Sequence, residues 1–82
     1  MQNNNILTKE EKEYLSNIIK PFRHRVISII KIGYNDRYFI SIRIQSKFTL
    51  SKIELTNLPI FNTDMYKGME SNKDYNLKDL GL

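Results

Sequence analysis

The sequence predicts a single α+β domain in which one N-terminal helix packs on a small antiparallel sheet. Apolar residues between positions 14 and 22 recur with the spacing of one helix face. Two later segments alternate with a period of two on either side of a turn sequence, which is typical of a hairpin. The chain has 82 residues, so we expect residues 1–82 to form one domain.

The first element is a helix over about residues 9–20. Thr8 followed by Glu11 matches a capping box, in which each side chain satisfies a main-chain donor of the other residue. Pro21 disfavours the helical conformation of the residue before it, so we expect the helix to end there. Residues 1–6 are expected to be frayed. The helix would pack through one apolar stripe formed by Tyr14, Leu15, Ile18, Ile19 and Phe22.

The segments RHRVISIIKIGY and RYFISIRIQS predict a β-hairpin over about residues 23–46. Residues 33–36 separate them with the sequence Gly-Tyr-Asn-Asp, which is typical of a turn. In the second segment, Tyr38, Ile40, Ile42 and Ile44 alternate with Arg37, Phe39, Ser41, Arg43 and Gln45. One face of the hairpin would therefore be apolar and would receive the helix.

The register of the hairpin depends on the length of its loop. A two-residue Asn35–Asp36 loop would pair Ile32 with Phe39, which sets the apolar row of one strand against the wrong row of the other. A loop of three or five residues aligns the apolar rows. We therefore predict the longer loop, which pairs Ile32 with Tyr38, Ile30 with Ile40 and Val26 with Ile44.

In that register the other face of the hairpin is the candidate binding site. It would hold a small apolar centre of Ile27, Ile29 and Phe39 surrounded by cations. Clustered guanidinium groups suit phosphate or carboxylate recognition, whereas a solvated basic face is the simpler interpretation. The predicted site residues are Arg23, Arg25, Lys31, Arg37, Phe39, Arg43 and Gln45.

The C-terminal part predicts a third strand and a packed tail. The strand would cover about residues 52–58 and end at Pro59. Gly68 would serve a turn. The tail contains too many apolar residues to be free, so we expect it to pack back on the sheet. Asn76 would cap one short helical turn over 77–80, which Gly81 stops.

Charge is distributed unevenly along the chain. Between positions 20 and 52 there are eight basic residues and one acidic residue, within a total net charge of +4. A basic middle between acidic ends favours an anionic partner, such as an acidic protein surface or a nucleic acid.

The sequence offers no catalytic or metal-binding constellation. His24 is the single histidine, there is no cysteine, and Gly68 lacks the pattern of a phosphate loop. We interpret His24 as a partly exposed residue at the start of a strand. We expect a non-enzyme with no cofactor and no metal. Without a signal peptide or a long apolar run, we also expect a cytoplasmic protein that does not enter a membrane.

Several blocks, KPFRHRV, LPIF, MYKGME and DYNLKDLGL, resemble a group of small proteins from phages and mobile elements of low-GC Gram-positive bacteria. The resemblance implies a phage setting, in which small proteins often inhibit host defence, as anti-CRISPR proteins do. It carries no catalytic residue. The function expected is a non-enzymatic inhibitor that occupies the surface of a host defence protein.

Other functions also fit these residues. One is a small basic protein that binds nucleic acid or regulates its use, because bases could stack on Phe39 and Tyr34 beside the arginines. A weaker one is a sponge for a signalling nucleotide across an oligomer interface. A homodimer is also compatible with the small size of the domain.

Overall fold

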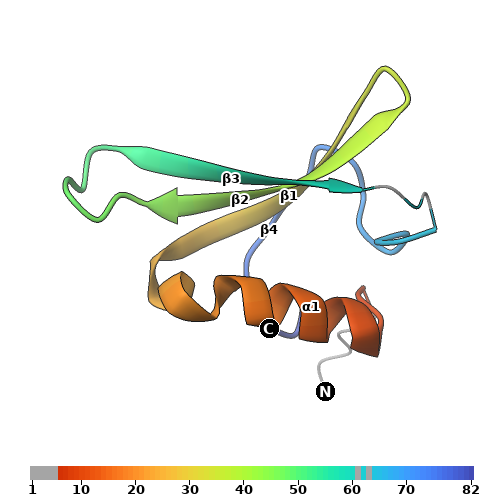
Figure 1. The fold of residues 1–82 in the computed structure, drawn as a ribbon, viewed down its shortest axis with the longest axis horizontal. Helices are drawn as coiled ribbons and strands as arrows, with labels where there is room; N and C mark the ends of the chain where they lie inside the picture. Colours follow the sequence, from red (N-terminus) through yellow and green to blue (C-terminus); the bar gives the residue numbers. More distant parts are fainter. Residues whose placement is uncertain (1–5, 61, 63) are drawn as a thin grey trace.

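A computed structural model describes residues 6–60, 62 and 64–82. Within these residues the four strands form one antiparallel sheet in the order β3-β2-β1-β4, and α1 packs on one face of it (Figure 1). This arrangement confirms the predicted α+β class. The elements are α1 (Lys9–Ile19), the 3-10 helix η1 (Lys20–Arg25), β1 (Val26–Tyr34), β2 (Arg37–Gln45), β3 (Ile53–Ile60) and β4 (Asp74–Tyr75).

The capping box at the start of α1 is confirmed. The Thr8 hydroxyl accepts a hydrogen bond from the Glu11 main-chain N–H at 3.2 Å, and the Glu11 carboxylate accepts one from the Thr8 N–H at 3.0 Å. Glu11 is buried, and its second carboxylate oxygen accepts a 2.7 Å hydrogen bond from the Tyr66 N–H. One side chain therefore begins the helix and also fixes the tail against it.

The PFRHRV segment does not begin the hairpin as predicted. The chain continues from α1 into η1, with a kink at Phe22, and the strand starts only at Val26. Pro21 is tolerated because it lies in the first turn of η1, where no helical hydrogen bond needs its missing N–H. Arg23 and Arg25 consequently lie on a helical turn, and His24 is exposed there and not at a strand start.

The predicted register of the hairpin is wrong by one residue over most of its length. Asn35 and Asp36 form a two-residue turn with φ of 47° and 63°, and Ile32 pairs with Phe39. Left-handed conformations at both positions give the turn that matches the twist of paired strands, and Asn and Asp tolerate them better than most residues. The backbone geometry of the turn thus outweighs the alignment of apolar rows.

A β-bulge at Ile27 partly restores that alignment. The register shifts between Val26 and Ser28, so Val26 pairs with Ile44 as the sequence predicts. An extra residue in one strand reverses which side of the sheet the following side chains occupy. Of the isoleucines in β1, only Ile29 is fully buried, and it pairs with Ile42.

The hydrophobic core lies between α1, the sheet and the tail. Its fully buried side chains come from α1, β1, β2 and the tail, and Tyr66, Met69 and Tyr75 of the tail pack with them. The tail therefore fills the space on the helix side of the sheet (Figure 1). The fully buried set is Leu15, Ile19, Ile29, Ile40, Ile42 and Leu80.

The third strand is present but extends further than predicted. It runs from Ile53 to Ile60 and includes Pro59, which the sequence places after its end. Proline is tolerated in β3 because this strand lies at the sheet edge, where an N–H facing away from the sheet has no partner to lose. The two-residue strand β4 was not predicted; it pairs with β1 at the opposite edge.

The end of the tail is a hydrogen-bonded turn and is not assigned as the predicted short helix. Asn76 and Asp79 exchange hydrogen bonds between their side chains and main-chain N–H groups, at 2.7 and 3.2 Å. The Leu82 N–H closes the turn on the Leu77 carbonyl at 2.8 Å, and Gly81 adopts a φ of 72°.

The start of the described chain is packed. Ile6 lies against the core, whereas residues 1–5, Phe61 and Thr63 fall outside the described residues. A Cβ atom added at Gly68 would lie 2.1 Å from the Ile6 carbonyl oxygen, so only glycine fits between this backbone and the tail. None of the described helices has the length and apolar character needed to cross a membrane.

We expect Gly68→Ala to lower the free energy of unfolding by about 1–3 kcal/mol, because the new methyl group must displace the Ile6 backbone. Gly33→Ala is the matched control. Its methyl group would meet only the edge of the Tyr38 ring, at 2.7 Å, and that ring can move. Urea denaturation followed by circular dichroism measures both; a larger loss for Gly33→Ala would contradict the packing described.

We expect Asp36→Gly to be more stable than Asp36→Ala by about 1–2 kcal/mol, since a left-handed φ strains alanine and not glycine. The comparison at one position cancels any effect of losing the carboxylate. Thermal denaturation of the two variants measures the difference. Equal stability would mean that residue 36 is not left-handed.

Candidate functional site

The candidate site is the sheet face turned away from α1, here called the outer face. Residues directly paired across neighbouring strands share one face, and the row of Ile29, Ile42 and Ile40 is buried toward the helix. The alternate rows therefore form the outer face. Its central members are Ser28, Ile30, Ile32, Phe39, Ser41, Arg43, Leu55, Asn57 and Pro59.

The two-residue turn makes this face more apolar than the sequence predicts. Ile30 pairs with Ser41, and Ile32 pairs with Phe39, whose other neighbour is Pro59. The predicted centre of Ile27, Ile29 and Phe39 is thus replaced by Ile30, Ile32 and Phe39, because Ile29 is buried in the core. On β3, Ile53 and Leu55 are 46% and 60% exposed, and they continue the apolar surface to the sheet edge.

The loop over residues 46–52, here called the KFTLSK loop, extends that surface. The side-chain amide of Gln45 donates to the carbonyls of Leu50 and Lys52 at 2.7 and 3.0 Å, and the Ser46 hydroxyl accepts from the Phe48 N–H at 3.2 Å. The loop is therefore held in shape by its own hydrogen bonds. It projects Phe48 and Leu50, each 87% exposed, between Lys47 and Lys52.

Sequence reasoning missed Phe48 and Leu50 as site residues. The signal was present, because two apolar residues alternate with polar ones in a short segment that contains no acidic residue. The same alternation is typical of a β-strand, so it does not by itself indicate a loop with exposed apolar side chains. Gln45 was predicted to bind a ligand, whereas its amide group is used to shape the loop.

Three of the predicted basic site residues, Arg23, Arg25 and Lys31, donate hydrogen bonds to main-chain oxygens of this chain. Arg23 donates to the main-chain oxygen of Leu82. Arg25 donates to the Gln45 carbonyl at 3.0 Å and lies 3.8 Å from the Glu54 carboxylate. Both arginines come from η1 and connect it to other parts of the chain, so the predicted pairing of these arginines on one strand face is wrong.

Lys31 lies on the helix side of the sheet and not on the outer face, because it pairs with Ile40. Its ammonium group donates to the Tyr66 carbonyl at 2.9 Å and lies 3.5 Å from the Met69 carbonyl. The side chain also lies over the Tyr38 ring, 5.6 Å from its centroid. Lys31 therefore holds the tail against β1, and its placement in the predicted site is wrong.

Arg37, Phe39 and Arg43 lie on the outer face as predicted from the alternation of β2. Arg43 is 3.7 Å from Asp74 of β4, and Asp74 also accepts a 3.3 Å hydrogen bond from the Ser28 hydroxyl. The ion pair is partly exposed, so its stabilising effect is small. Arg37 lies at the hairpin end, where no acidic side chain of the described residues forms an ion pair with it.

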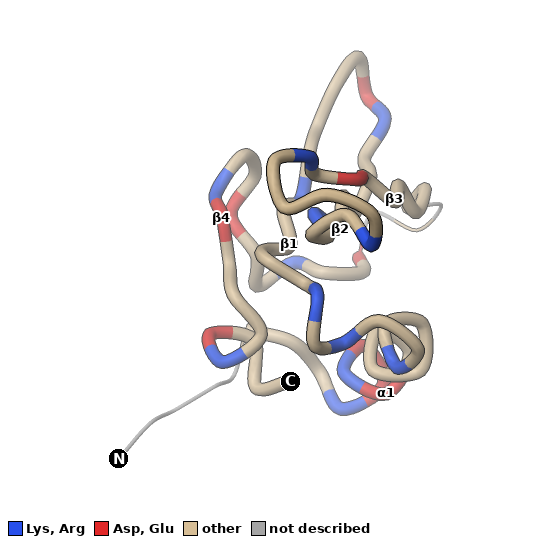
Figure 2. The backbone as a smooth tube through the Cα atoms, turned by 90° about the vertical axis from the view of Figure 1, so that its left-hand side faces the viewer, with Lys and Arg blue, Asp and Glu red and all other residues tan. Residues whose placement is uncertain are grey.

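The predicted basic site residues are therefore divided between η1, the helix side of the sheet and the outer face. Figure 2 shows acidic positions beside basic ones near β4 and at the hairpin end. Within the described residues, no group of three or more His, Cys, Asp or Glu side chains could hold a metal ion. The outer face and the KFTLSK loop together present an apolar surface with cations at its margin, which suits binding rather than acid–base chemistry.

Comparison with protein-family models, with curated proteins and with solved structures gave no match to this chain.

Proposed function

We propose that this protein is a non-enzymatic binding protein that docks onto a partner protein through its outer face and KFTLSK loop. The observation that carries the proposal is the exposure of four large apolar side chains on β3 and the KFTLSK loop: Phe48, Leu50, Ile53 and Leu55. Large exposed apolar surfaces in small proteins are typical of interaction sites. The rim cations Arg37, Lys47 and Lys52 suit an acidic margin on the partner.

A protein partner explains the distribution of charge better than a nucleic acid does. Affinity for a phosphate backbone depends on several cations that are free to contact it. Arg23, Arg25 and Lys31 instead satisfy oxygens of this chain. The centre of the outer face is formed by isoleucine, phenylalanine and leucine, side chains that gain free energy when a partner removes them from water.

The resemblance to small phage proteins supports a more specific form of the proposal. The partner would be a component of a bacterial defence system, and docking would block a surface that this component needs. Inhibition by occupancy requires no catalytic group. An anti-CRISPR protein of this kind would act in stoichiometric amounts in the cytoplasm of the host.

We expect Leu55→Glu to reduce capture of the partner protein at least tenfold, because it places a charge within the exposed apolar surface. Tyr14→Glu is the matched control, since Tyr14 is similarly exposed but lies on α1, away from the outer face. The measurement is a quantitative pull-down from nuclease-treated lysate of a low-GC Gram-positive bacterium. Circular dichroism checks that both variants are folded. Equal capture by the two variants would contradict the site.

The rival function, nucleic-acid binding, predicts a different dependence on salt. If six or more phosphates were contacted, affinity for a labelled single-stranded oligonucleotide would fall about 1,000-fold or more between about 50 and 200 mM salt. We expect weak binding at both concentrations. Tight binding at low salt with that dependence, and loss of all captured protein after nuclease, would replace our proposal by the rival one.

A further inference from the structure

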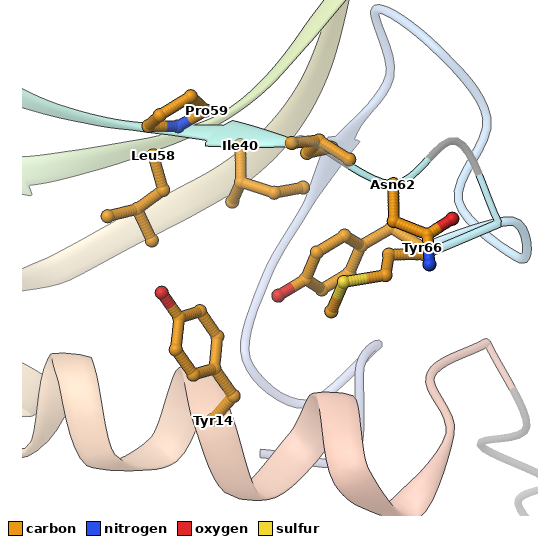
Figure 3. A pocket seen from close by; sticks show the side chains of 8 residues that line it. Tyr14, Ile40, Leu58, Pro59, Asn62 and Tyr66 are labelled. Carbon is orange, nitrogen blue, oxygen red and sulfur yellow. The ribbon is translucent and has the colours of Figure 1, made fainter.

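A cleft lies between α1 and β3 on the helix side of the sheet, and of its lining residues only Pro59 also belongs to the outer face. Its volume is about 260 Å³. Figure 3 shows Leu58, Pro59 and Ile40 on the sheet side, Tyr14 rising from α1 and Tyr66 closing one end. The lining is completed by Ile60, Asn62 and Met65.

The Tyr66 hydroxyl is the unusual feature of this cleft. Tyr66 is 3% exposed, and within the described residues its hydroxyl has no hydrogen-bond partner. Figure 3 shows the hydroxyl directed into the space between Leu58 and Tyr14. Buried polar groups are nearly always hydrogen-bonded, so an unpartnered one requires an explanation.

The position of Tyr66 is firmly set by its backbone. Its N–H donates to Glu11 at 2.7 Å, its carbonyl accepts from Lys31 at 2.9 Å, and its φ is 60°. These contacts fix where the side chain leaves the backbone, and packing in the core holds the buried ring in place. Phenylalanine would fill the same volume without a buried hydroxyl, and leaving such a group unpaired destabilises the fold.

The hydroxyl is a hydrogen-bond donor under ordinary conditions. Burial, with smaller contributions from Glu11 and Tyr14, raises the pKa of Tyr66 to about 12. The group is therefore protonated throughout the physiological range and can donate a hydrogen bond to an acceptor oxygen.

We propose that the cleft binds a small uncharged molecule that has an apolar body and one acceptor oxygen, which pairs with the Tyr66 hydroxyl. The described lining contains no Lys, Arg, Asp or Glu side chain, so a charged ligand would lose its hydration without compensation. The volume lies just below the range of about 300–1,000 Å³ that is typical of ligand pockets, so the ligand is small. Tyr14, half exposed, would cover the ligand from the side of α1.

The inference does not depend on the outer face or its partner, and it can be tested with two probes of nearly identical shape. Acetophenone carries a carbonyl oxygen, whereas α-methylstyrene has a methylene group in its place. Each is titrated into the full chain and into Tyr66→Phe, with the Met65 methyl and the Leu58 and Ile60 amide resonances followed by nuclear magnetic resonance. The ratio of the dissociation constants of the two probes is then compared between the parent chain and Tyr66→Phe. The difference in hydration between the probes is the same in both proteins and cancels.

We expect both probes to shift the cleft resonances, and Tyr66→Phe to reduce the preference for acetophenone over α-methylstyrene by about 3- to 10-fold. Tyr66→Phe should also unfold at an equal or higher denaturant concentration than the parent chain, which excludes misfolding as the cause. An unchanged preference would overturn the role of the hydroxyl. An absence of shifts, or shifts on the outer face instead, would overturn the site.

Discussion

The turn at Asn35–Asp36 decides which side chains each face of the sheet presents. Two successive left-handed residues close the hairpin with no room for a longer loop, so Ile32 must pair with Phe39 and Lys31 with Ile40. Because side chains alternate between faces, this single constraint divides the isoleucines of β1 between core and surface. Ile29 enters the core, whereas Ile30 and Ile32 join Phe39 on the outer face, and Lys31 is turned toward the tail.

The basic residues acquire their roles from the same geometry. Lys31 faces the tail and satisfies carbonyls there, while Arg23 and Arg25 connect η1 to the end of the chain and to β2. Part of the positive charge in the middle of the sequence thus holds segments of the chain together. The surface left for a partner is apolar at its centre and basic at its margin, which is why we favour a protein partner over a phosphate backbone.

Local patterns were sufficient to predict α1, its cap at Thr8 and Glu11, the alternation of β2 and the existence of β3. Features that depend on contacts between distant residues could not be predicted. The hydrogen-bond partners of Arg23 and Lys31 lie 59 and 35 positions away in the sequence. The strand β4 has only two residues, which is too short to show the alternation of apolar and polar side chains. The predicted register was wrong for another reason. Both rows of side chains in β1 contain isoleucine, so either row could face the core, and the geometry of the two-residue turn determines which row does. Of the predicted site residues, Arg37, Phe39 and Arg43 of β2 lie on the outer face as the alternation predicts, whereas Arg23 and Arg25 lie on η1.

The pairing of β1 with β2 can be measured directly from Hα–Hα nuclear Overhauser effects, which are strong between non-hydrogen-bonded partners of antiparallel strands because their Cα atoms lie only about 4.5 Å apart. A two-residue turn predicts such effects between Lys31 and Ile40 and between Ile29 and Ile42. Finding them would establish that Ile30 and Ile32 belong to the outer face. An effect between Ile30 and Ile40 instead would indicate the longer loop, return those isoleucines to the core side and contradict the binding surface on which our account rests.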